Sequence, residues 1–480
     1  MPQVRRTALL WSGVWVALVP VALARAGLLA ESDTFWEIRT GQLILAAKRI
    51  PSTDPFSWTA YGRAWRPNSW GFDVLLAPVY RLGGLTAVAL LGAALVMAVI
   101  AAMLLLANHL GAGPVPAAVP LLLAAPLLIA WFSVRPQLVD YVVVPLLVIL
   151  LDAAATAGGR RRAAAVVGIA GLHLAWVNLH ASATLGVALT GAAGIAAAAE
   201  RLHGRSRGTG GRSARRHRAA IALVTATLPV LAAILGTLAN PAGRAVIAQG
   251  MHVHSASTDL IVEWRRWSPT DVVQTLTLAV GLLALATALA KRRWRLASVL
   301  TVLAVGGVLA VRLQPILAVC AVPVLGLALD RTALRAWARK RRVLLGGALA
   351  ALVAGYGVLA AQAFPHLGRP AYPVASIRAL PSGCRLANSY DIGGLVILLR
   401  PDVPVSMDSR NDLYGRAEAV RFKHLVERPA DGVQQLAGMG VECVLVPGGS
   451  GLARQLVDDP RWRRIVDDRR GSVFVRADGG

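Results

Sequence analysis

Long apolar runs restrict the fold of this chain more than any other feature of its sequence. Four of them extend for about 20 residues, enough for a helix to cross the roughly 30 Å hydrocarbon core of a bilayer; they are 10–29, 87–107, 219–238 and 343–361. Hydrophobic residues make up 56% of the sequence and charged residues only 16%, which predicts an α-helical polytopic membrane protein. The first run follows two arginines, as in a signal peptide, but its length favours a retained first span.

The positive charge is concentrated in short segments between apolar runs. The formal net charge is +25, and the basic clusters are 160–162, 201–218, 291–295 and 330–342. Loops rich in Lys and Arg remain in the cytoplasm, so these clusters indicate orientation in the cell (plasma) membrane. Nucleic-acid binding is the alternative for so basic a chain, but clusters confined to short loops favour contact with anionic membrane lipids. We expect no nucleic acid as a partner.

Placing every basic cluster in the cytoplasm predicts about eleven transmembrane helices. Their ranges are 8–30, 84–107, 114–132, 136–157, 163–179, 182–200, 219–238, 271–290, 296–312, 314–330 and 343–363. This arrangement divides the chain into a transmembrane domain, 1–364, with a long first outer loop, 31–83, and an extracytoplasmic domain, 365–480.

The C-terminal segment 365–480 has a different pattern from the rest. Short β-branched runs such as CRLANSY, GLVILLR and VPVSMDS come before helical stretches such as AEAVRFKHLVE and GLARQLVDD, with VECVLVPG and GSVFVRA among them. Strands that alternate with helices predict a small α/β domain. An extracytoplasmic compartment would permit a disulfide between Cys384 and Cys443. Sequence alone gives no distance between the two cysteines, so their pairing stays open.

The predicted topology places most of the unusual polar residues at the outer membrane boundary. Polar residues that converge there from many helices indicate an active site or a binding cleft. The residues we expect to bind substrate are Arg135, Arg312, His180, Asp54, Arg244 and Glu263.

Two acids of the first outer loop have different local contexts. Asp33 lies next to Phe35 and Trp36, and a carboxylate partly desolvated by aromatic rings can act as a general base. A residue beside an interfacial aromatic belt would look the same without any chemistry. Asp54, in IPSTDPFSW, also fits an Asx-type turn, which favours a structural role.

Arg135 and Arg312 each lie close to a proline at an outer helix end. A guanidinium binds phosphate through two hydrogen bonds and stays charged, so both suit a phosphate or pyrophosphate group. Snorkelling to lipid phosphates is the alternative. His180, in WVNLHAS, could bind substrate or carry a proton, or could be structural.

Several motifs together resemble one superfamily of membrane enzymes. They are DTFWEIRTGQLIL and RIPSTDPFSWTAYGRAW in the first loop, then RPQL, WVNLHAS, LANPAGR, EWRRWSP, RLQPILA, NSYDIGG and VSMDSRNDLYG. The set resembles bacterial polytopic members of the GT-C glycosyltransferase superfamily, whose donors are polyprenyl-phosphate sugars. The resemblance covers most of the chain and implies that Asp33 is the catalytic base. Where relatives often carry His-Glu-Trp, this chain has Asn68-Ser69-Trp70, so a divalent cation is left open.

These observations predict an integral-membrane glycosyltransferase. It would move a sugar from a polyprenyl-phosphate donor to a glycan, lipid or protein acceptor on the extracytoplasmic face. The alternative is a non-catalytic membrane scaffold, or a glycolipid-binding or transport protein, in assembly of the cell envelope. A transporter would need ionisable residues deep in its spans, but these helices are nearly free of charge apart from Asp140, near the outer end of the predicted helix 136–157.

Overall fold

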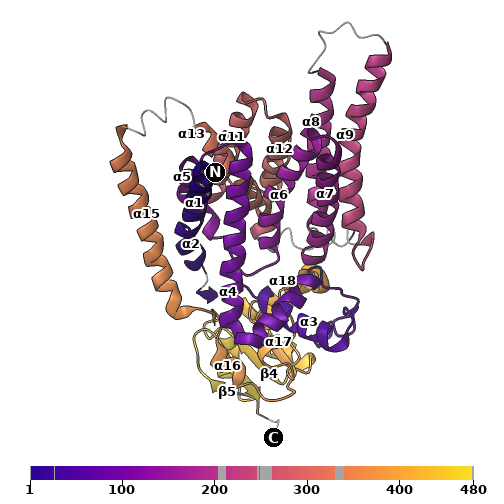
Figure 1. The fold of residues 1–480 in the computed structure, drawn as a ribbon. Helices are drawn as coiled ribbons and strands as arrows, with labels where there is room; N and C mark the ends of the chain where they lie inside the picture. Colours follow the sequence, from indigo (N-terminus) through magenta and orange to yellow (C-terminus); the bar gives the residue numbers. More distant parts are fainter. Residues whose placement is uncertain are drawn as a thin grey trace. The chain divides into compact units, whose positions relative to one another are not determined.

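A computed structural model describes residues 2–25, 27–203, 212–245, 248, 262–329 and 340–477. The chain forms two compact units (Figure 1). The first, which we call the helical unit, contains Met1–Gly27, Leu91–Gly250 and Glu263–His366. The second, the loop–tail unit, joins Leu28–Leu90 to Leu367–Gly480. The first outer loop therefore belongs to the same unit as the C-terminal segment, although the sequence assigned it to the transmembrane domain.

The helical unit contains most of the apolar helices. Its elements are α1 (Pro2–Ala17), α2 (Val19–Leu23), the later part of α4 (Trp70–Leu110), α5 (Pro114–Ile129), α6 (Gln137–Thr156), α7 (Gly159–Leu179), α8 (Ala183–His203), α9 (Arg212–Leu238), α11 (Val272–Ala290), α12 (Trp294–Leu309), α13 (Gln314–Leu329) and α15 (Arg342–Ala363), with the 3₁₀ turns η1 (Val262–Trp264), η2 (Val311–Leu313) and η3 (Phe364–His366). Figure 1 shows α6, α7, α8 and α9 side by side.

Length and hydropathy identify the helices that can cross a membrane. Among the described residues eight stretches qualify: Trp70–Leu110, Gln137–Thr156, Gly159–Leu179, Ala183–His203, Arg216–Leu238, Val272–Ala290, Val311–Leu329 and Val343–His366. Three apolar helices are shorter, namely Ala8–Leu23, Pro114–Ile129 and Trp294–Leu309. The chain is therefore mostly helical and has the helices of a membrane-embedded protein, and the count of about eleven spans stays a prediction.

The centre of the helical unit is α13, which packs against α5, α6, α11 and α12. Its residues are buried on every side from Gln314 to Val324, as expected for a helix that is apolar all round. Small residues allow its neighbours to approach. A Cβ atom added to Gly236 of α9, for example, would lie 2.4 Å from the carbonyl oxygen of Ala170 in α7, and such close contacts between backbones are typical of membrane helices.

The loop–tail unit contains two small sheets. β1 (Leu28–Leu29) pairs in parallel with β2 (Arg369–Pro370). The larger sheet has the order β3-β4-β6-β5, in which β3 (Leu386–Asn388) and β4 (Cys443–Val446) are parallel, and β6 (Ser472–Arg476) is antiparallel to both β4 and β5 (Trp462–Val466). The accompanying helices are α3 (Asp33–Ala47), the start of α4, α16 (Val374–Arg378), α17 (Gly393–Leu399), α18 (Asn411–Glu427), α19 (Gly432–Gly438) and α20 (Gly451–Asp458).

The C-terminal segment has the expected mixture of strands and helices, but two runs expected as strands do not form them. The run VPVSMDS forms only an isolated bridge, between Val405 and Ser57. The run GLVILLR, expected as a strand, forms helix α17, because close contacts fix its first turn. Cβ atoms on Gly393 and Gly394 would lie 2.2 Å from the carbonyl oxygens of Met407 and Ser32. A strand would separate these glycines on opposite faces. Strand β5 was not expected, because its sequence WRRIV is largely polar.

Segment 31–83 contains regular structure that the sequence interpretation treated as loop. Residues 33–47 form helix α3, whose N-terminal half is buried. Helix α4 then begins at Trp70 and is interrupted by non-helical backbone at Gly83 and Gly84. Gly84 has φ +59°, a conformation that other residues rarely adopt. This break coincides with the start of the predicted second span, 84–107.

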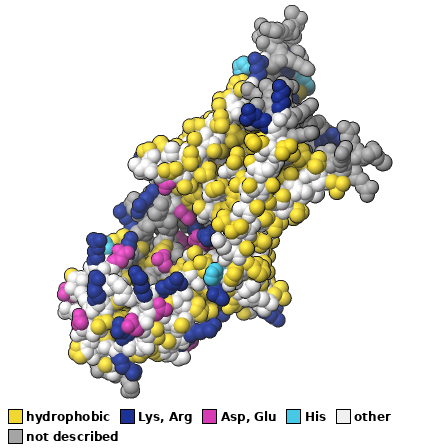
Figure 2. Space-filling model, turned by 90° about the vertical axis from the view of Figure 1, so that its left-hand side faces the viewer, with side chains coloured by type: hydrophobic (Ala, Val, Ile, Leu, Met, Phe, Trp, Pro, Cys, Tyr) yellow, Lys and Arg dark blue, Asp and Glu magenta, His cyan; other side chains and the backbone are white. Residues whose placement is uncertain are grey.

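The two units expose different side chains. Figure 2 shows hydrophobic side chains over the visible face of the helical unit, and Lys, Arg, Asp and Glu mixed over the visible face of the loop–tail unit. Exposed apolar residues of the helical unit include Ile195, Leu235 and Val343. An apolar exterior on helices of spanning length is what a lipid environment requires.

Candidate functional site

Three of the predicted substrate-binding residues meet in the helical unit. The Arg135 Nη1 atom lies 2.9 Å from Glu263 Oε1, and Arg312 Nη1 lies 3.6 Å from Glu263 Oε2. With its amide oxygen turned toward them, Gln137 accepts hydrogen bonds from Nη2 of both arginines. We call Arg135, Gln137, Glu263 and Arg312 the outer arginine cluster. It brings together two cations and one anion, and a second acid, Asp140, also acts electrostatically on Arg312.

The outer arginine cluster lies where two helices begin. Arg135 and Gln137 are at the start of α6, and Arg312 precedes α13, which packs against α6. Helix N-termini carry partial positive charge and attract anions. The side chains of Arg135, Arg312 and Glu263 are 12%, 19% and 24% exposed, so the cluster is partly desolvated but reachable.

The electrostatics of Glu263 follow from these neighbours. Burial alone would raise the pKa of its carboxyl group, but Arg135 and Arg312 overcome this and lower it. Glu263 is therefore ionised at neutral pH. Trp264, the next residue, stacks on Arg312, whose Cζ atom lies 4.8 Å from the centroid of the indole ring. The carboxylate and the indole ring thus fix the direction of both guanidinium groups.

A second polar group lies one helical turn further along α6. The Asp140 Oδ1 atom accepts hydrogen bonds from Trp176 Nε1 at 2.7 Å, His180 Nδ1 at 2.8 Å and Ser182 Oγ at 2.6 Å. Asp140 is 3% exposed and His180 is 7% exposed. This is the arrangement of an oriented histidine, because the carboxylate fixes the ring and leaves the opposite nitrogen, Nε2, available.

The Asp140–His180 pair and the outer arginine cluster both include residues of helix α6. Gln137 and Asp140 are three residues apart on α6, so their side chains lie on the same face on adjacent turns. His180 follows the last residue of α7, which packs against α6. The helical unit therefore places two arginines close to a histidine that could transfer protons.

The other predicted residues of the helical unit have different roles. Asn178 and Asn240 join two turns, since the Asn240 amide donates to the carbonyl of Val177 and to Asn178 Oδ1 at 3.1 and 3.3 Å. Arg244 lies in an exposed turn. None of the ion pairs among the described residues includes Arg244, so the structure does not bring it to the outer arginine cluster.

Comparison with known proteins adds no identity. No model of a protein family matches this sequence, and no curated protein matches it significantly. The resemblance to GT-C glycosyltransferases stays a prediction.

Asp33 belongs to the loop–tail unit, where it begins α3. Trp36 Nε1 donates to Asp33 Oδ1 at 3.3 Å and to Ser409 Oγ at 3.1 Å. Tyr390 donates to the carbonyl of Ser409, and burial followed by the charge of Asp33 raises the pKa of the Tyr390 phenol. Asp33 is half-buried and lies among residues of the motifs NSYDIGG and SMDSRND. The motifs of the first loop and the tail thus form one polar site.

Asp54 is a structural residue of the same unit. Its carboxylate accepts from the backbone N–H groups of Phe56 at 3.1 Å and Ser57 at 3.0 Å, as predicted for an Asx-type turn. It also lies 2.7 Å from Arg410 Nη1. Arg410 in turn contacts Asp408 at 2.6 Å through Nη2 and at 2.7 Å through Nε. We call Asp54, Asp408, Arg410 and Tyr414 the Arg410 cluster.

The Arg410 cluster is sealed from solvent. The side chains of Arg410, Asp54 and Asp408 are 0% exposed. Burial alone would lower the pKa of Arg410, but Asp408, Tyr414 and Asp54 raise it well above its usual value. Burial and then Asp408 likewise raise the pKa of Tyr414. Rings of Phe56 and Trp65 lie 5.0 and 4.6 Å from the guanidinium carbon, which leaves no room for a ligand.

The loop–tail unit shows a disulfide but no evident metal centre. Cys384 and Cys443 are bonded, with Cα atoms 6.1 Å apart. In the part of the chain that the structure describes, no group of three His, Cys, Asp or Glu residues could hold a metal ion. At Asn68-Ser69-Trp70, Ser69 donates to Asn68 Oδ1 at 2.8 Å and precedes α4. Asp73, in the next turn, is fully buried and its two carboxylate oxygens lack hydrogen-bond partners among the described residues.

Sequence reasoning missed several residues of these sites. Gln137, Trp176 and Ser182 received no role, and Asp408 and Arg410 were noted only within VSMDSRNDLYG. One signal was available for Asp408 and Arg410, because the D-x-R triplet in VSMDSRNDLYG places an acid and an arginine two residues apart. Ser182 and Trp176 gave a weaker signal, since both flank His180 in a motif already quoted.

Proposed function

We propose that this chain is an integral-membrane glycosyltransferase that transfers a sugar from a polyprenyl-phosphate donor. The observation that carries the proposal is the outer arginine cluster. Two arginines meet around one carboxylate in a partly desolvated place, at the start of two helices. Such a site favours a phosphate group, which a guanidinium binds through two hydrogen bonds.

In this reaction the outer arginine cluster would stabilise the departing phosphate. The acceptor oxygen bonds to the anomeric carbon while the bond from that carbon to the lipid-phosphate oxygen breaks. The electron pair leaves with the phosphate, and the acceptor proton passes to a base. Negative charge grows on the phosphate in an oxocarbenium-like transition state. Arg135 and Arg312 would stabilise that charge, the largest contribution that such a site can make.

Two residues are candidates for the base. Asp33, half-buried beside Trp36, is the base that the GT-C resemblance implies. His180, oriented by Asp140 in the helical unit, can also accept a proton, and Asp140 lies one turn of α6 from Gln137 of the outer arginine cluster. We propose Asp33 as the base and His180 as a substrate-binding residue that positions the donor, and substitution of each residue separates these roles.

The finer architecture is part of the same proposal. We propose a GT-C-like arrangement of about eleven spans in the cell membrane, with the loop–tail unit outside the cytoplasm. The Cys384–Cys443 disulfide supports that location, because disulfides persist in oxidising compartments. The basic clusters between the spans support the same orientation.

The decisive experiment measures transfer by the purified full-length protein in reconstituted membranes. With a polyprenyl-phosphate sugar as donor, Arg312→Gln should lower transfer and weaken donor binding, because the phosphate contact exists before the reaction. Asp33→Asn should lower turnover by about 10² to 10⁴ with little change in donor binding. Arg81→Gln, at an exposed position of α4, is the matched control.

The outcomes distinguish enzyme from scaffold. Well-folded Asp33→Asn protein with full transfer would remove Asp33 from the mechanism. Equal loss in Arg81→Gln and Arg312→Gln would show a general charge effect. Donor binding that depends on Arg312, without transfer to glycan, lipid or protein acceptors, would favour the alternative of a glycolipid-binding scaffold or transport protein. The Asn68-Ser69 pair in place of His-Glu is the observation that keeps this alternative.

A further inference from the structure

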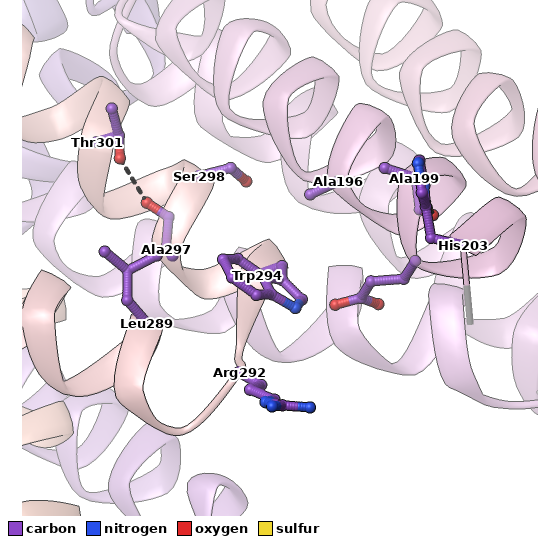
Figure 3. A pocket seen from close by; sticks show the side chains of 10 residues that line it. Ala196, Ala199, His203, Leu289, Arg292, Trp294, Ala297, Ser298 and Thr301 are labelled. Carbon is purple, nitrogen blue, oxygen red and sulfur yellow. Dashed lines mark hydrogen bonds between the residues drawn. The ribbon is translucent and has the colours of Figure 1, made fainter.

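A cavity lies in the helical unit, between α8, the end of α11 and the start of α12 (Figure 3). Its volume is about 740 Å³. The walls are mostly apolar, from Ala196, Ala199, Leu289 and Ala297, and the polar lining residues are Glu200, His203, Arg292, Trp294, Ser298 and Thr301. The cavity is separated from the outer arginine cluster by most of α6, roughly 22 Å for the fifteen residues from Gln137 to Asp152.

Most polar groups of this cavity are already paired. Ser298 and Thr301 donate to the backbone carbonyls of Arg295 and Ala297 at 2.8 and 2.9 Å. Glu200 lies 3.4 Å from Arg295 Nη1, and Arg295 also contacts Asp152 at 3.0 Å. The acids at this end of the helices are therefore neutralised within the protein.

Arg292 and Trp294 carry hydrogen-bond donors that are unused among the described residues. Among the described residues, no hydrogen bond or ion pair uses the Arg292 guanidinium or the Trp294 indole N–H. Figure 3 shows Trp294 in the middle of the cavity and Arg292 beside it. Both are exposed, and they belong to the run KRRWR, 291–295, which supplies four basic residues at one helix junction.

The backbone at Arg292 is unusual. Its φ is +55°, in the left-handed region, at a position after a helix end where glycine is the common choice. Residues with a Cβ atom rarely adopt this conformation, because it is sterically unfavourable for them. Such a cost at a cavity edge points to a functional role for the side chain.

We infer that this cavity binds an anionic phospholipid, with the headgroup phosphate at Arg292 and Trp294 and an acyl chain along the alanines. The cavity lies at the ends of spans Ala183–His203 and Val272–Ala290, the depth of lipid headgroups. Tryptophan is enriched at this depth, and basic pockets between membrane helices bind anionic headgroups. Charge and shape both match: the free donors are cationic or N–H groups, and the remaining wall is apolar.

The test is a titration of the detergent-solubilised full-length protein with phosphatidylglycerol or phosphatidylcholine, with bound lipid counted by native mass spectrometry. Wild-type protein should bind one phosphatidylglycerol more tightly than phosphatidylcholine. Arg292→Asn removes the charge and keeps a residue that tolerates positive φ. It should weaken phosphatidylglycerol binding about fivefold, the effect of one basic side chain at an anionic surface. Lys291→Gln, an exposed neighbour outside the cavity lining, should leave binding unchanged.

A second variant tests the acyl slot. Ala196→Phe fills the apolar wall without changing charge, and should also weaken phosphatidylglycerol binding. Thermal unfolding of each variant in phosphatidylcholine checks that it folds. Equal affinity for the two lipids, or equal loss in Lys291→Gln and Arg292→Asn, would overturn the inference. Displacement of the lipid by glycerol phosphate, with no effect of Ala196→Phe, would show a simple anion site and would also overturn it.

Discussion

The two charge clusters of this chain contain the same residue types but differ in their charge balance and exposure. The Arg410 cluster in the loop–tail unit has two acids around one arginine, and all three side chains are 0% exposed. The outer arginine cluster in the helical unit has two arginines around one acid, and its side chains are 12% to 24% exposed. One cluster is closed and its carboxylates are fully hydrogen-bonded, and the other is partly open to solvent.

Hydrogen bonding explains the contrast. Each carboxylate oxygen of Asp54 and Asp408 accepts two hydrogen bonds, from backbone N–H groups, Ser57, Tyr414 and Arg410. These oxygens have no free acceptor position for a ligand. Loss of any partner would leave a charge buried in an apolar environment without compensation. Glu263, in contrast, shares one carboxylate between two guanidinium groups. Stability should therefore depend on the first cluster and anion binding on the second.

The largest effect is expected from Arg410→Met. Removing one partner of a buried ion pair costs about 3–5 kcal/mol, because the remaining charges stay buried without compensation. We expect loss of folded protein, measured as protease resistance of the loop–tail unit in the full-length chain. Arg421→Met, in helix α18, which Arg410 precedes, changes a side chain that is 57% exposed; it is the control and should change little. Equal stability of the two variants would show that the Arg410 cluster is not structural.

The Arg410 cluster also bears on the C-terminal segment as an autonomous domain. The sequence predicts that 372–477 folds alone, and this stays a prediction. The structure shows Asp54 of the first loop in the core of the unit, and Trp58 Nε1 donating to the carbonyl of Leu386 at 2.7 Å. We therefore expect 372–477 to gain stability when residues 28–90 are supplied in the same chain.

Breaking the disulfide should cost less than breaking the Arg410 cluster. Cys384 and Cys443 close a loop of 59 residues, and such a crosslink typically contributes about 2–4 kcal/mol. A reducing agent should lower the unfolding temperature of the loop–tail unit in wild-type protein but not in Cys384→Ala/Cys443→Ala protein. Cys320→Ala, which changes the free buried cysteine, should keep the wild-type response. A wild-type protein that is insensitive to reduction would contradict a stabilising disulfide.

Apolar pattern and local chemistry account for what could be predicted from sequence. The helices 136–157 and 343–363 match α6 and α15 within one residue or so, because ends of apolar runs define them. Arg135, Glu263 and Arg312 were expected at one boundary because basic loops orient the spans, and the structure brings them together. The Asx turn at Asp54 follows from its neighbours alone.

Long-range pairing accounts for most of what was missed. Asp54 and Arg410 are 356 residues apart in sequence, so no local pattern could join them. Helix α3 was treated as loop because its residues 33–47 mix apolar and polar side chains without a clean helical stripe. Its burial comes from contact with α17, which is also distant in sequence. The separation of Asp33 and Asp54 into different roles likewise depends on these contacts.

A smaller effect is expected from Glu263→Gln, which should tighten anion binding and lower the stability of the folded protein. Without the acid, the two arginines of the outer cluster keep more charge for a ligand. Inorganic pyrophosphate should bind about fivefold tighter, a change of about 1 kcal/mol. Stability should fall by about 1 kcal/mol or less, because the pairs are partly exposed. Tighter binding should disappear in Glu263→Gln/Arg312→Gln protein. Unchanged or weaker pyrophosphate binding in Glu263→Gln protein would show that the cluster is closed, like that of Arg410.

The smallest effect is the response of the helical unit to acid. The arginines lower the pKa of Glu263 in the folded protein, from an ordinary value of about 4.3 in the unfolded chain. A carboxyl group with a lowered pKa contributes stability that is fully present above its unfolded pKa and is lost as pH falls through its folded pKa. Unfolding temperatures measured in detergent should therefore differ between wild-type and Glu263→Gln protein at pH 7, and the difference should be lost only as pH falls below the ordinary carboxyl pKa of about 4.3. A difference that vanished between pH 6 and 5 would mean that Glu263 titrates there, and that the two arginines do not hold it ionised.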